Sequence, residues 1–161
     1  MKKKYGFLCD RMLGKLCRML RLLGFDAKLN PDGESGRFLL NADREGRIAV
    51  TRARRRYDRP GTRAVILTGE TAHEQAVELL EALPEPPRIE PFTRCLECNE
   101  ALVEESPSSV TEEIPAFIAE HFKQYHRCPS CRRIYWEGSH FEAMSAEIEK
   151  IRTRLGERRE Q

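Results

Sequence analysis

Four of the six cysteines form two Cys-x-x-Cys pairs, and this pattern constrains the fold more than any other feature of the sequence. The pairs are Cys95/Cys98 and Cys128/Cys131, separated by residues 99–127, 29 in all. Each pair predicts a tight turn that points two sulfurs at one ion, and two such turns complete the tetrahedral thiolate shell of structural Zn²⁺. We therefore expect a zinc-ribbon-like module whose metal holds the fold and does no chemistry, because four cysteines leave no open coordination position.

The long spacer between the pairs must hold extra structure, because a minimal ribbon needs fewer residues. Disulfide pairing of the same cysteines is the alternative, but small disulfide scaffolds belong to secreted proteins. The basic start of the chain reaches Asp10 and Arg11 before any adequate apolar stretch, which disfavours a signal peptide. No apolar run has the length of a membrane span. We expect a reducing cytoplasmic location and no membrane partner.

The formal net charge of +2 conceals an uneven distribution along the chain. Residues 1–63 hold 17 Lys and Arg against 7 Asp and Glu, and residues 64–161 hold 11 against 19. Such asymmetry is typical of a region that faces a polyanion, followed by a more acidic body. The alternative is a solvated surface on which the charges mix in three dimensions.

Short apolar runs alternate with helical patterns in the first half of the chain. Strands that alternate with helices along the chain predict a parallel sheet flanked by helices, which is an α/β fold. Thr71 and Glu74 are spaced as a capping box for the third helix. The strands are expected over residues 5–9, 25–29, 47–51 and 64–68, and the helices over about 11–23, 36–45 and 71–83.

The proline-rich stretch at residues 84–87 predicts a linker, because Pro can neither continue a helix nor join a strand ladder. We place an α/β domain at residues 1–88 and a zinc-ribbon module at 89–161. The second module is expected to contain a short helix near 114–122, a strand at 133–136 and a closing helix from Phe141 to about Leu155.

Asp10 follows the first strand, and ligands of a parallel α/β sheet bind beyond the carboxyl ends of the strands. Acids gathered there from neighbouring strands would hold one or two Mg²⁺ or Mn²⁺ ions and activate water to attack a phosphodiester. One acid after one strand is a weak signal by itself.

The chain resembles the Mut-seven C-terminal RNase domain family, which is related to PIN nucleases. The resemblance runs in order along nearly the whole chain and rests on Phe7–Leu16, Leu20–Asp26, Glu45–Arg52, the two knuckles Arg94–Asn99 and Arg127–Cys131, and Ile134–His140. It implies a PIN-like three-layer α/β/α domain followed by a zinc ribbon, and metal-dependent endoribonuclease activity that uses clustered acids.

Carried over by position, Asp10 matches the first acid of the family. The candidates for a second acid are Asp32 and Glu34. Where the family usually has Thr-Arg-Asp, this chain has Thr51-Arg52-Ala53, and alanine cannot supply an oxygen ligand. Asp58 would replace the lost carboxylate if its loop folds back.

Several basic residues lie where the mouth of the family's active site is expected. Positive charge there favours holding a phosphate backbone, which makes RNA the expected partner. Two further interpretations stay open, namely an inactive RNA- or ribonucleoprotein-binding module and a protein-interaction module that uses the acidic second half. The candidate RNA-binding residues are Lys15, Arg52, Arg54, Arg55, Arg56 and Arg59.

The remaining cysteines, aromatics and histidines have less specific interpretations. Cys9 and Cys17 lie in apolar surroundings and are expected to be small buried residues. Tyr135 and Trp136 either pack against the zinc module or stack on a nucleobase. His140 either contacts a substrate or caps the last helix, and His73 is expected to be exposed. The oligomeric state is not indicated by the sequence.

Overall fold

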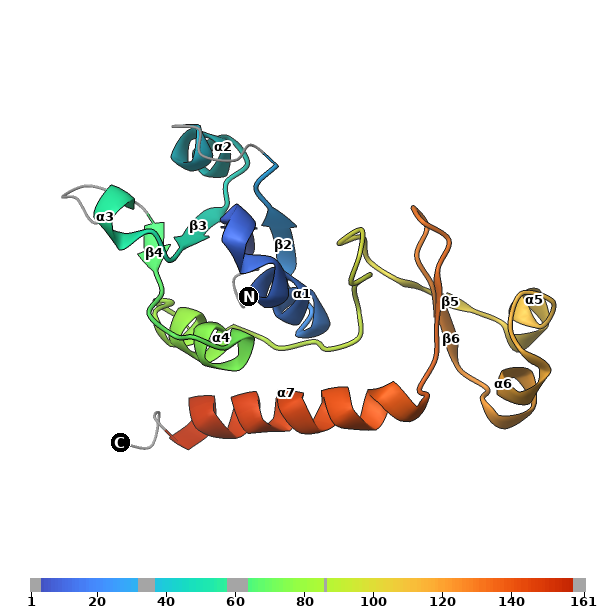
Figure 1. Ribbon diagram of the computed structural model, residues 1–161. Helices are drawn as coiled ribbons and strands as arrows, with labels where there is room; N and C mark the ends of the chain where they lie inside the picture. Colours follow the sequence, from blue (N-terminus) through green and yellow to red (C-terminus); the bar gives the residue numbers. More distant parts are fainter. Residues whose placement is uncertain (1–3, 32–36, 58–63, 86, 158–161) are drawn as a thin grey trace.

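The computed structural model describes residues 4–31, 37–57, 64–85 and 87–157, which form two sheets and a long C-terminal helix that runs beneath both (Figure 1). In the first part of the chain the elements are β1 (Gly6–Cys9), η1 (Arg11–Leu13), α1 (Gly14–Leu22), β2 (Asp26–Leu29), α2 (Phe38–Arg44), β3 (Ile48–Thr51), α3 (Arg54–Tyr57), β4 (Ala64–Ile66) and α4 (Ala72–Glu81). In the second part they are β5 (Val103–Glu105), α5 (Pro107–Val110), α6 (Ala116–His121), β6 (Tyr125–Arg127), β7 (Ile134–Tyr135) and α7 (Ser139–Glu157).

The first sheet has four parallel strands in the order β2-β1-β3-β4. The chain passes from β1 to β2 on one side and then crosses to β3 on the other side of β1. The strand order therefore reverses between β1 and β3, which is where ligands bind in open α/β sheets. The prediction of a parallel sheet flanked by helices is confirmed.

Both faces of this sheet are covered by helices. Alternate residues of β1 point to opposite faces, so Phe7 and Cys9 join one core while Leu8 joins the other. The second core contains Phe38 of α2, whose ring packs edge-on against Tyr57 of α3 at 5.5 Å between centroids. Burial on both faces explains why the strands have near-continuous apolar sequences.

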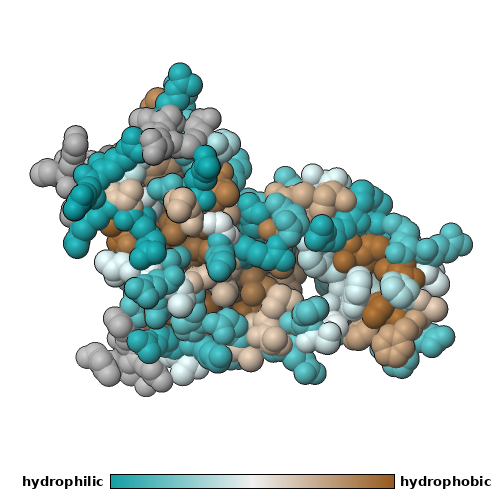
Figure 2. All heavy atoms as spheres, in the orientation of Figure 1, coloured by the Kyte–Doolittle hydropathy of each residue, from teal (hydrophilic) through white to brown (hydrophobic). Residues whose placement is uncertain are grey.

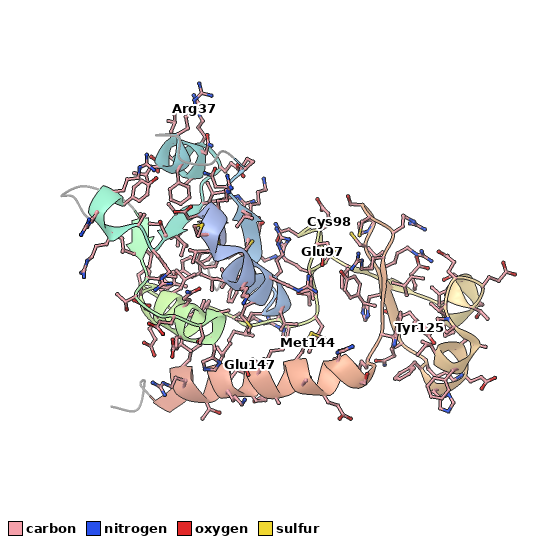
Figure 3. The ribbon with its side chains drawn as sticks, in the orientation of Figure 1. Arg37, Glu97, Cys98, Tyr125, Met144 and Glu147 are labelled. Atoms are coloured by element: carbon pink, nitrogen blue, oxygen red, sulfur yellow. The ribbon has the colours of Figure 1, made fainter. Side chains whose placement is uncertain are left out.

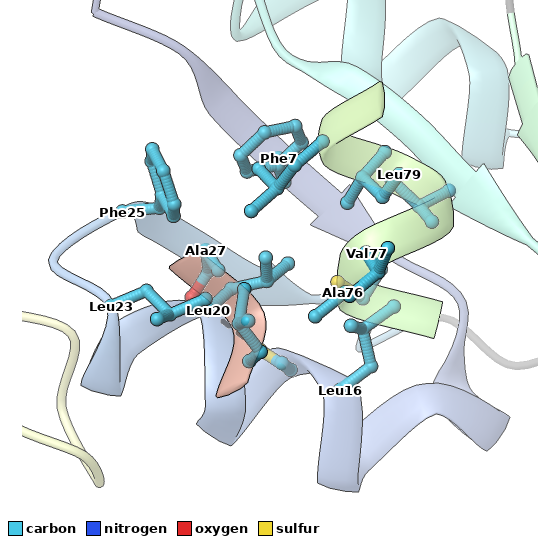
Figure 4. Close-up of a cluster of buried hydrophobic side chains, with 14 of the residues drawn as sticks. Phe7, Leu16, Leu20, Leu23, Phe25, Ala27, Ala76, Val77 and Leu79 are labelled. Atoms are coloured by element: carbon cyan, nitrogen blue, oxygen red, sulfur yellow. Dashed lines mark hydrogen bonds between the residues drawn. The ribbon is translucent and has the colours of Figure 1, made fainter. Parts of the chain in front are cut away.

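The larger core lies between the sheet, α1 and α4, and α7 closes it (Figure 4). Leu16, Leu20 and Leu23 recur at helical spacing and are fully buried. The capping box of α4 is present, with the Thr71 hydroxyl accepting from the Glu74 N–H and the Glu74 carboxylate accepting from the Thr71 N–H. The predicted helix after β1 and the predicted capping box of α4 are both confirmed.

The second sheet is antiparallel, in the order β5-β6-β7, and the spacer between the cysteine pairs supplies β5, β6 and the short helices α5 and α6. Arg127, one residue before Cys128, is 2% exposed and holds the spacer together through Glu105 at 2.8 Å and Glu113 at 2.7 Å. The expectation that the spacer holds extra structure is correct, although only one of its two helices was expected.

Helix α7 begins beside the second sheet and ends on the first core (Figure 1). Ile148, Ile151 and Leu155 are buried in the same cluster as α1 and α4. His73 of α4 contacts Glu147 of α7, with 2.6 Å between Nδ1 and Oε1, and Figure 3 shows Glu147 on the side of α7 that faces α4. The expectation that His73 is exposed is wrong, because α7 packs against it and leaves its side chain half-buried. The division of the chain at residue 88 stays a prediction.

Other boundaries differ slightly from those expected from the sequence. The first expected helix is a 3-10 turn followed by α1, because Leu13, with φ −100° and ψ 35°, departs from the helical conformation before α1 begins at Gly14. The basic segment after β3 contains the short helix α3, which the sequence pattern did not indicate. Among the described residues, no helix combines the length and the apolar character that a membrane crossing requires.

Candidate functional site

The four cysteines predicted as metal ligands lie together in space. The Sγ atoms of Cys95, Cys98, Cys128 and Cys131 are all within 4.8 Å of one another. Thiolates about 2.3 Å from a tetrahedral Zn²⁺ lie about 3.8 Å apart, and the Sγ atoms of Cys95 and Cys131 are 3.7 Å apart. A disulfide would need about 2.05 Å. The donor set therefore fits one metal ion such as zinc.

The two cysteine turns have nearly the same backbone geometry. In the first turn the N–H of Cys98 points at Sγ of Cys95, and in the second the N–H of Cys131 points at Sγ of Cys128. Each turn ends in a residue with positive φ, Asn99 at 66° in the first and Arg132 at 65° in the second. Asn tolerates this left-handed conformation, whereas Arg adopts it at a cost that a bound metal would offset.

Tyr135 of β7 connects the second sheet to the first cysteine turn. Its hydroxyl accepts from the N–H of Leu96 at 3.2 Å and contacts Sγ of Cys95 at 3.1 Å. Burial alone would raise the pKa of the Cys95 thiol, but the Tyr135 hydroxyl and the N–H of Cys98 outweigh it and lower the pKa to about 6. A thiol with a lowered pKa is readily deprotonated, as metal binding requires.

The first cysteine turn docks on the open edge of the parallel sheet. The Asn99 side chain accepts from the N–H of Ala27 in β2 at 3.0 Å and donates to the carboxylate of Asp26. Arg21 of α1 donates to the carbonyl of Ala27, and also to the carbonyls of Leu96 and Glu97, each at 2.8 Å. The turn thus satisfies backbone groups that an edge strand would otherwise expose.

Asp26 is itself held by Arg47, which directly precedes β3 on the other side of β1. Arg47 contacts the two carboxylate oxygens of Asp26 at 2.8 and 2.9 Å. Burial opposes the charge of Asp26, but Arg47 and Asn99 together lower the pKa of its carboxyl. Glu97 and Cys98, labelled in Figure 3, lie on the segment between the two sheets, where α1 and the second sheet approach each other. The metal-ligating turn and the base of the parallel sheet therefore form one bonded network.

Asp10 lies at the opposite, carboxyl end of the strands, at the point where strand order reverses. Its N–H donates to the carbonyl of Val50, which ties the end of β1 to β3. The hydroxyl of Thr51 donates to Oδ2 of Asp10 at 2.7 Å and accepts from the N–H of Ala53 at 3.0 Å. Thr51 is fully buried, so it fixes the orientation of the Asp10 carboxylate. Asn30, also buried, directly follows the neighbouring strand β2.

The basic residues predicted to contact phosphate follow directly after Thr51. Arg52 is exposed, and α3 presents Arg54, Arg55 and Arg56 as exposed side chains. Lys15 is exposed in the first turn of α1. Hydrophilic residues cover the part of the surface around α2 and α3 in Figure 2.

The other candidate acids, Asp32, Glu34 and Asp58, and the candidate Arg59 lie outside the described residues. Within the described part of the chain, the cysteines are the only group of three or more cysteine, histidine or acidic side chains whose ligand atoms cluster. Asp10 belongs to no such group among the described residues, and its carboxylate accepts a hydrogen bond from Thr51. The roles of Asp10, the other acids and the arginines stay predictions.

Cys9 and Cys17 are buried in the larger core, as expected, and Sγ of Cys17 donates to the carbonyl of Ala27.

The sequence did not indicate several residues that have structural roles at the two sites. Arg21 lies inside a predicted helix and Thr51 at the end of a predicted strand, and neither pattern indicates a specific partner. Asn99 carried a signal, because Asn directly after a Cys-x-x-Cys pair is suited to a positive φ.

A comparison with protein-family models finds the Mut7-C RNAse domain over residues 5–148. No curated protein and no solved structure matches the chain. The matched segment includes β1 with Asp10, the four cysteines and the first half of α7. The chain therefore belongs to the Mut7-C RNAse domain family.

Proposed function

We propose that this protein acts on RNA at the carboxyl edge of its parallel sheet, as a PIN-like endoribonuclease that uses Mg²⁺ or Mn²⁺ at Asp10. The observation that carries the proposal is the Asp10–Thr51 pair at the point of strand reversal. Among the described side chains only Thr51 hydrogen bonds to this carboxylate, and it uses Oδ2. Oδ1 accepts no hydrogen bond from these side chains, and a carboxylate oxygen is a ligand that these ions prefer.

A bound ion would activate water and stabilise the charge that develops on the attacked phosphate. Asp10 would hold the ion, and Thr51 would keep the carboxylate from turning away. Asp32, Glu34 and Asp58 are the proposed sources of the further oxygen ligands. Lys15, Arg52 and the arginines of α3, with Arg59, would hold the phosphate backbone of the RNA.

The four cysteines have a separate role in this proposal. They would hold one structural Zn²⁺ that fixes the first turn on the edge of β2. The structural ion would not contact the substrate, because all four of its positions are occupied by sulfur. None of the six cysteines is paired in a disulfide, which supports the proposal of a reducing, cytoplasmic compartment.

The test is cleavage of labelled single-stranded and structured RNA by the zinc-loaded protein, in Mn²⁺ and in EDTA. We expect cleavage in Mn²⁺ that is lost in EDTA and in Asp10→Asn. The matched control is Asp43→Asn, which makes the same charge change at an exposed position of α2 and should keep wild-type activity. Equal cleavage by wild type and Asp10→Asn would overturn the proposed site.

A second function, RNA binding without cleavage, is favoured by Ala53, which supplies no oxygen ligand where the family resemblance expects an acid. Its signature is RNA affinity that falls steeply with salt and is unaffected by EDTA or by Asp10→Asn. Negligible RNA affinity at moderate salt would instead leave a protein-interaction role for the acidic second half.

A further inference from the structure

An aromatic cavity lies at the other end of the molecule from Asp10, between α1, the second sheet and α7. Its volume is about 300 Å³, at the lower end of the range of roughly 300–1,000 Å³ that is usual for ligand pockets. Phe92, Tyr135, Trp136 and Phe141 contribute rings to its wall, and Met144, labelled on α7 in Figure 3, lines it as well. A cavity of this size and composition suits one flat ring system.

The ring of Phe92 is held in place by a strained backbone. Phe92 has a φ of 61°, a conformation that is a genuine outlier for a bulky residue. Its N–H donates to the carbonyl of Leu22 at the end of α1, and its ring stacks on Phe141 at 4.4 Å between centroids. Strain of this kind persists where the surrounding structure demands it, and it is concentrated at binding and catalytic sites.

On the opposite side of the cavity, the first cysteine turn holds the ring of Tyr135. The Tyr135 hydroxyl is fixed by Leu96 and Cys95, so this ring has little freedom to turn. Gly138 lies so close to Trp136 that a Cβ at this position would be 2.9 Å from the indole nitrogen. The rings are thus positioned before any ligand arrives.

Polar groups with unused hydrogen-bonding capacity surround these rings. Among the described residues, the side chains of Gln124, His126 and Glu137 and the indole N–H of Trp136 have no hydrogen-bond partner, and all four residues line the cavity. Together they supply donors and acceptors around an apolar slot. A nucleobase has matching chemistry, with two flat faces that stack and an edge of donors and acceptors.

The surface next to the cavity carries positive charge. Thr93 and Arg94 line both the aromatic cavity and a neighbouring hollow of about 640 Å³, where Lys4 and Arg88 also lie. The acids of that hollow are already paired, Asp26 with Arg47 and Glu90 with Arg88. A phosphate attached to a base in the cavity would therefore meet Arg94 and Lys4.

We propose that the aromatic cavity binds an unpaired nucleobase of an RNA strand, stacked among Phe92, Trp136 and Phe141 with its edge facing Gln124 and His126. This inference rests on the proposed action on RNA and adds a recognition site remote from Asp10. The cavity would anchor a single-stranded part of the substrate while the backbone is held at the Asp10 end.

Trp136 is the only tryptophan of the chain, so its fluorescence reports on the cavity directly. The test is titration of the zinc-loaded protein, without Mn²⁺, with hexa-adenylate, hexa-uridylate, AMP and ribose 5-phosphate. We expect both oligonucleotides to change the Trp136 fluorescence, AMP to do so at higher concentration, and ribose 5-phosphate to have no effect. A response to AMP equal to that of the oligonucleotides would identify a free-nucleotide site and overturn the strand proposal.

The key variant is Phe92→Gly, which removes the ring while glycine readily adopts the same positive φ. Base stacking contributes about 1–3 kcal/mol, so the dissociation constant of the oligonucleotide should rise roughly 5- to 150-fold. Gln124→Ala, at an exposed loop position, is a second variant and should weaken binding by a smaller factor. The matched control is Phe117→Ala, an exposed aromatic of α6 outside this cavity, which should bind like wild type.

Fluorescence anisotropy of labelled oligonucleotide separates the two proposals. RNA that binds with no change in Trp136 fluorescence and with equal affinity in Phe92→Gly would overturn the cavity proposal and leave the Asp10 site standing. RNA that fails to bind at all would overturn both. Loss of cleavage in Asp10→Asn with an unchanged fluorescence titration is the result expected if both are correct.

Discussion

The two ends of the parallel sheet differ in how their polar side chains are used. At the amino ends of the strands, Arg21, Asp26, Arg47 and Asn99 bond to one another or to backbone groups and join the sheet to the first cysteine turn. At the carboxyl ends, the Asp10 carboxylate has Thr51 as its one hydrogen-bond partner among the described residues, and the arginines of the adjoining segment are exposed. The polar side chains at the amino end join the sheet to the cysteine turn, and we propose that those at the carboxyl end meet a ligand.

This contrast gives the cysteine turns and the Asp10 end separate physical roles. The cysteine turns cover the edge of β2, which protects the sheet from pairing with other chains and fixes the position of α1. The Asp10 end then has a rigid base, and such rigidity is what a site needs if its groups are to be held in place for catalysis or binding.

The largest expected effect comes from removing a metal ligand with Cys128→Ser. Structural zinc contributes on the order of 10–16 kcal/mol in small zinc modules, so the variant should lose its metal and the folded state of the second sheet. Elemental analysis and thermal unfolding measure both effects. Cys17→Ala is the control, because this cysteine is buried outside the cluster and its loss should leave zinc content unchanged. One zinc ion per chain in Cys128→Ser would contradict the four-cysteine site.

Arg21→Met should have the next largest effect, because it leaves three carbonyl groups without their charged donor. We expect a loss of about 2–3 kcal/mol in the free energy of unfolding. Arg18→Met, one turn earlier, removes only an exposed ion pair with Glu97 and should change stability by less than about 0.5 kcal/mol. Urea unfolding of the two variants compares them directly. Equal losses would show that the docked turn does not depend on Arg21.

A pair of changes at Asn99 separates its side-chain bonds from its backbone conformation. Asn99→Gly keeps the positive φ but removes the bonds to Ala27 and Asp26, which should cost about 1–2 kcal/mol. Asn99→Ala should cost about 1 kcal/mol more, because alanine disfavours the left-handed region. If the alanine variant were as stable as the glycine variant in urea unfolding, the conformational part of this explanation would be wrong.

The lowered pKa of Asp26 makes the amino end sensitive to acid. An acid with a depressed pKa contributes stability above its unfolded pKa of about 3.9, and this contribution is lost as the pH falls through the folded value. The free energy of unfolding, measured from pH 7 to pH 3, should therefore fall less steeply below pH 4 in Asp26→Asn than in wild type. If the free energy of unfolding fell equally steeply with pH in wild type and Asp26→Asn, Asp26 would not be a source of the acid sensitivity.

The smallest expected effect on stability is that of Thr51→Val at the carboxyl end. The change removes one hydroxyl from a buried site and should cost about 1 kcal/mol. Its larger consequence should be weaker Mn²⁺ binding, because the Asp10 carboxylate loses the group that orients it. Thr51→Ser keeps the hydroxyl and should restore most of the affinity. Equal Mn²⁺ affinities of Thr51→Val and Thr51→Ser would show that Thr51 has no positioning role.

Much of this arrangement could be predicted from local sequence. The cysteine spacing indicated the metal site, the apolar runs indicated the strands, and the Thr71/Glu74 pair indicated the start of α4, because each depends on neighbours close in the chain. The docking of the first turn on β2 could not be predicted. It joins Arg21, Ala27 and Asn99 across more than 70 residues, and no local pattern encodes such a contact.

The same reason explains the incorrect prediction for His73. The sequence around it is that of a solvated helix face, and only the return of α7 places Glu147 against it. Thr51 is a third case. A threonine at the end of a strand is ordinary, and its bond to Asp10 follows from β1 and β3 being neighbours in the sheet.

The most direct test of the central claim is the binding of Mn²⁺ to the zinc-loaded protein in the absence of RNA, followed by electron paramagnetic resonance of the free ion. The account predicts saturable Mn²⁺ binding that is lost in Asp10→Asn and retained in Asp43→Asn. Binding that is equally tight in wild type and Asp10→Asn would contradict the assignment of the divalent ion to the carboxyl end of the sheet.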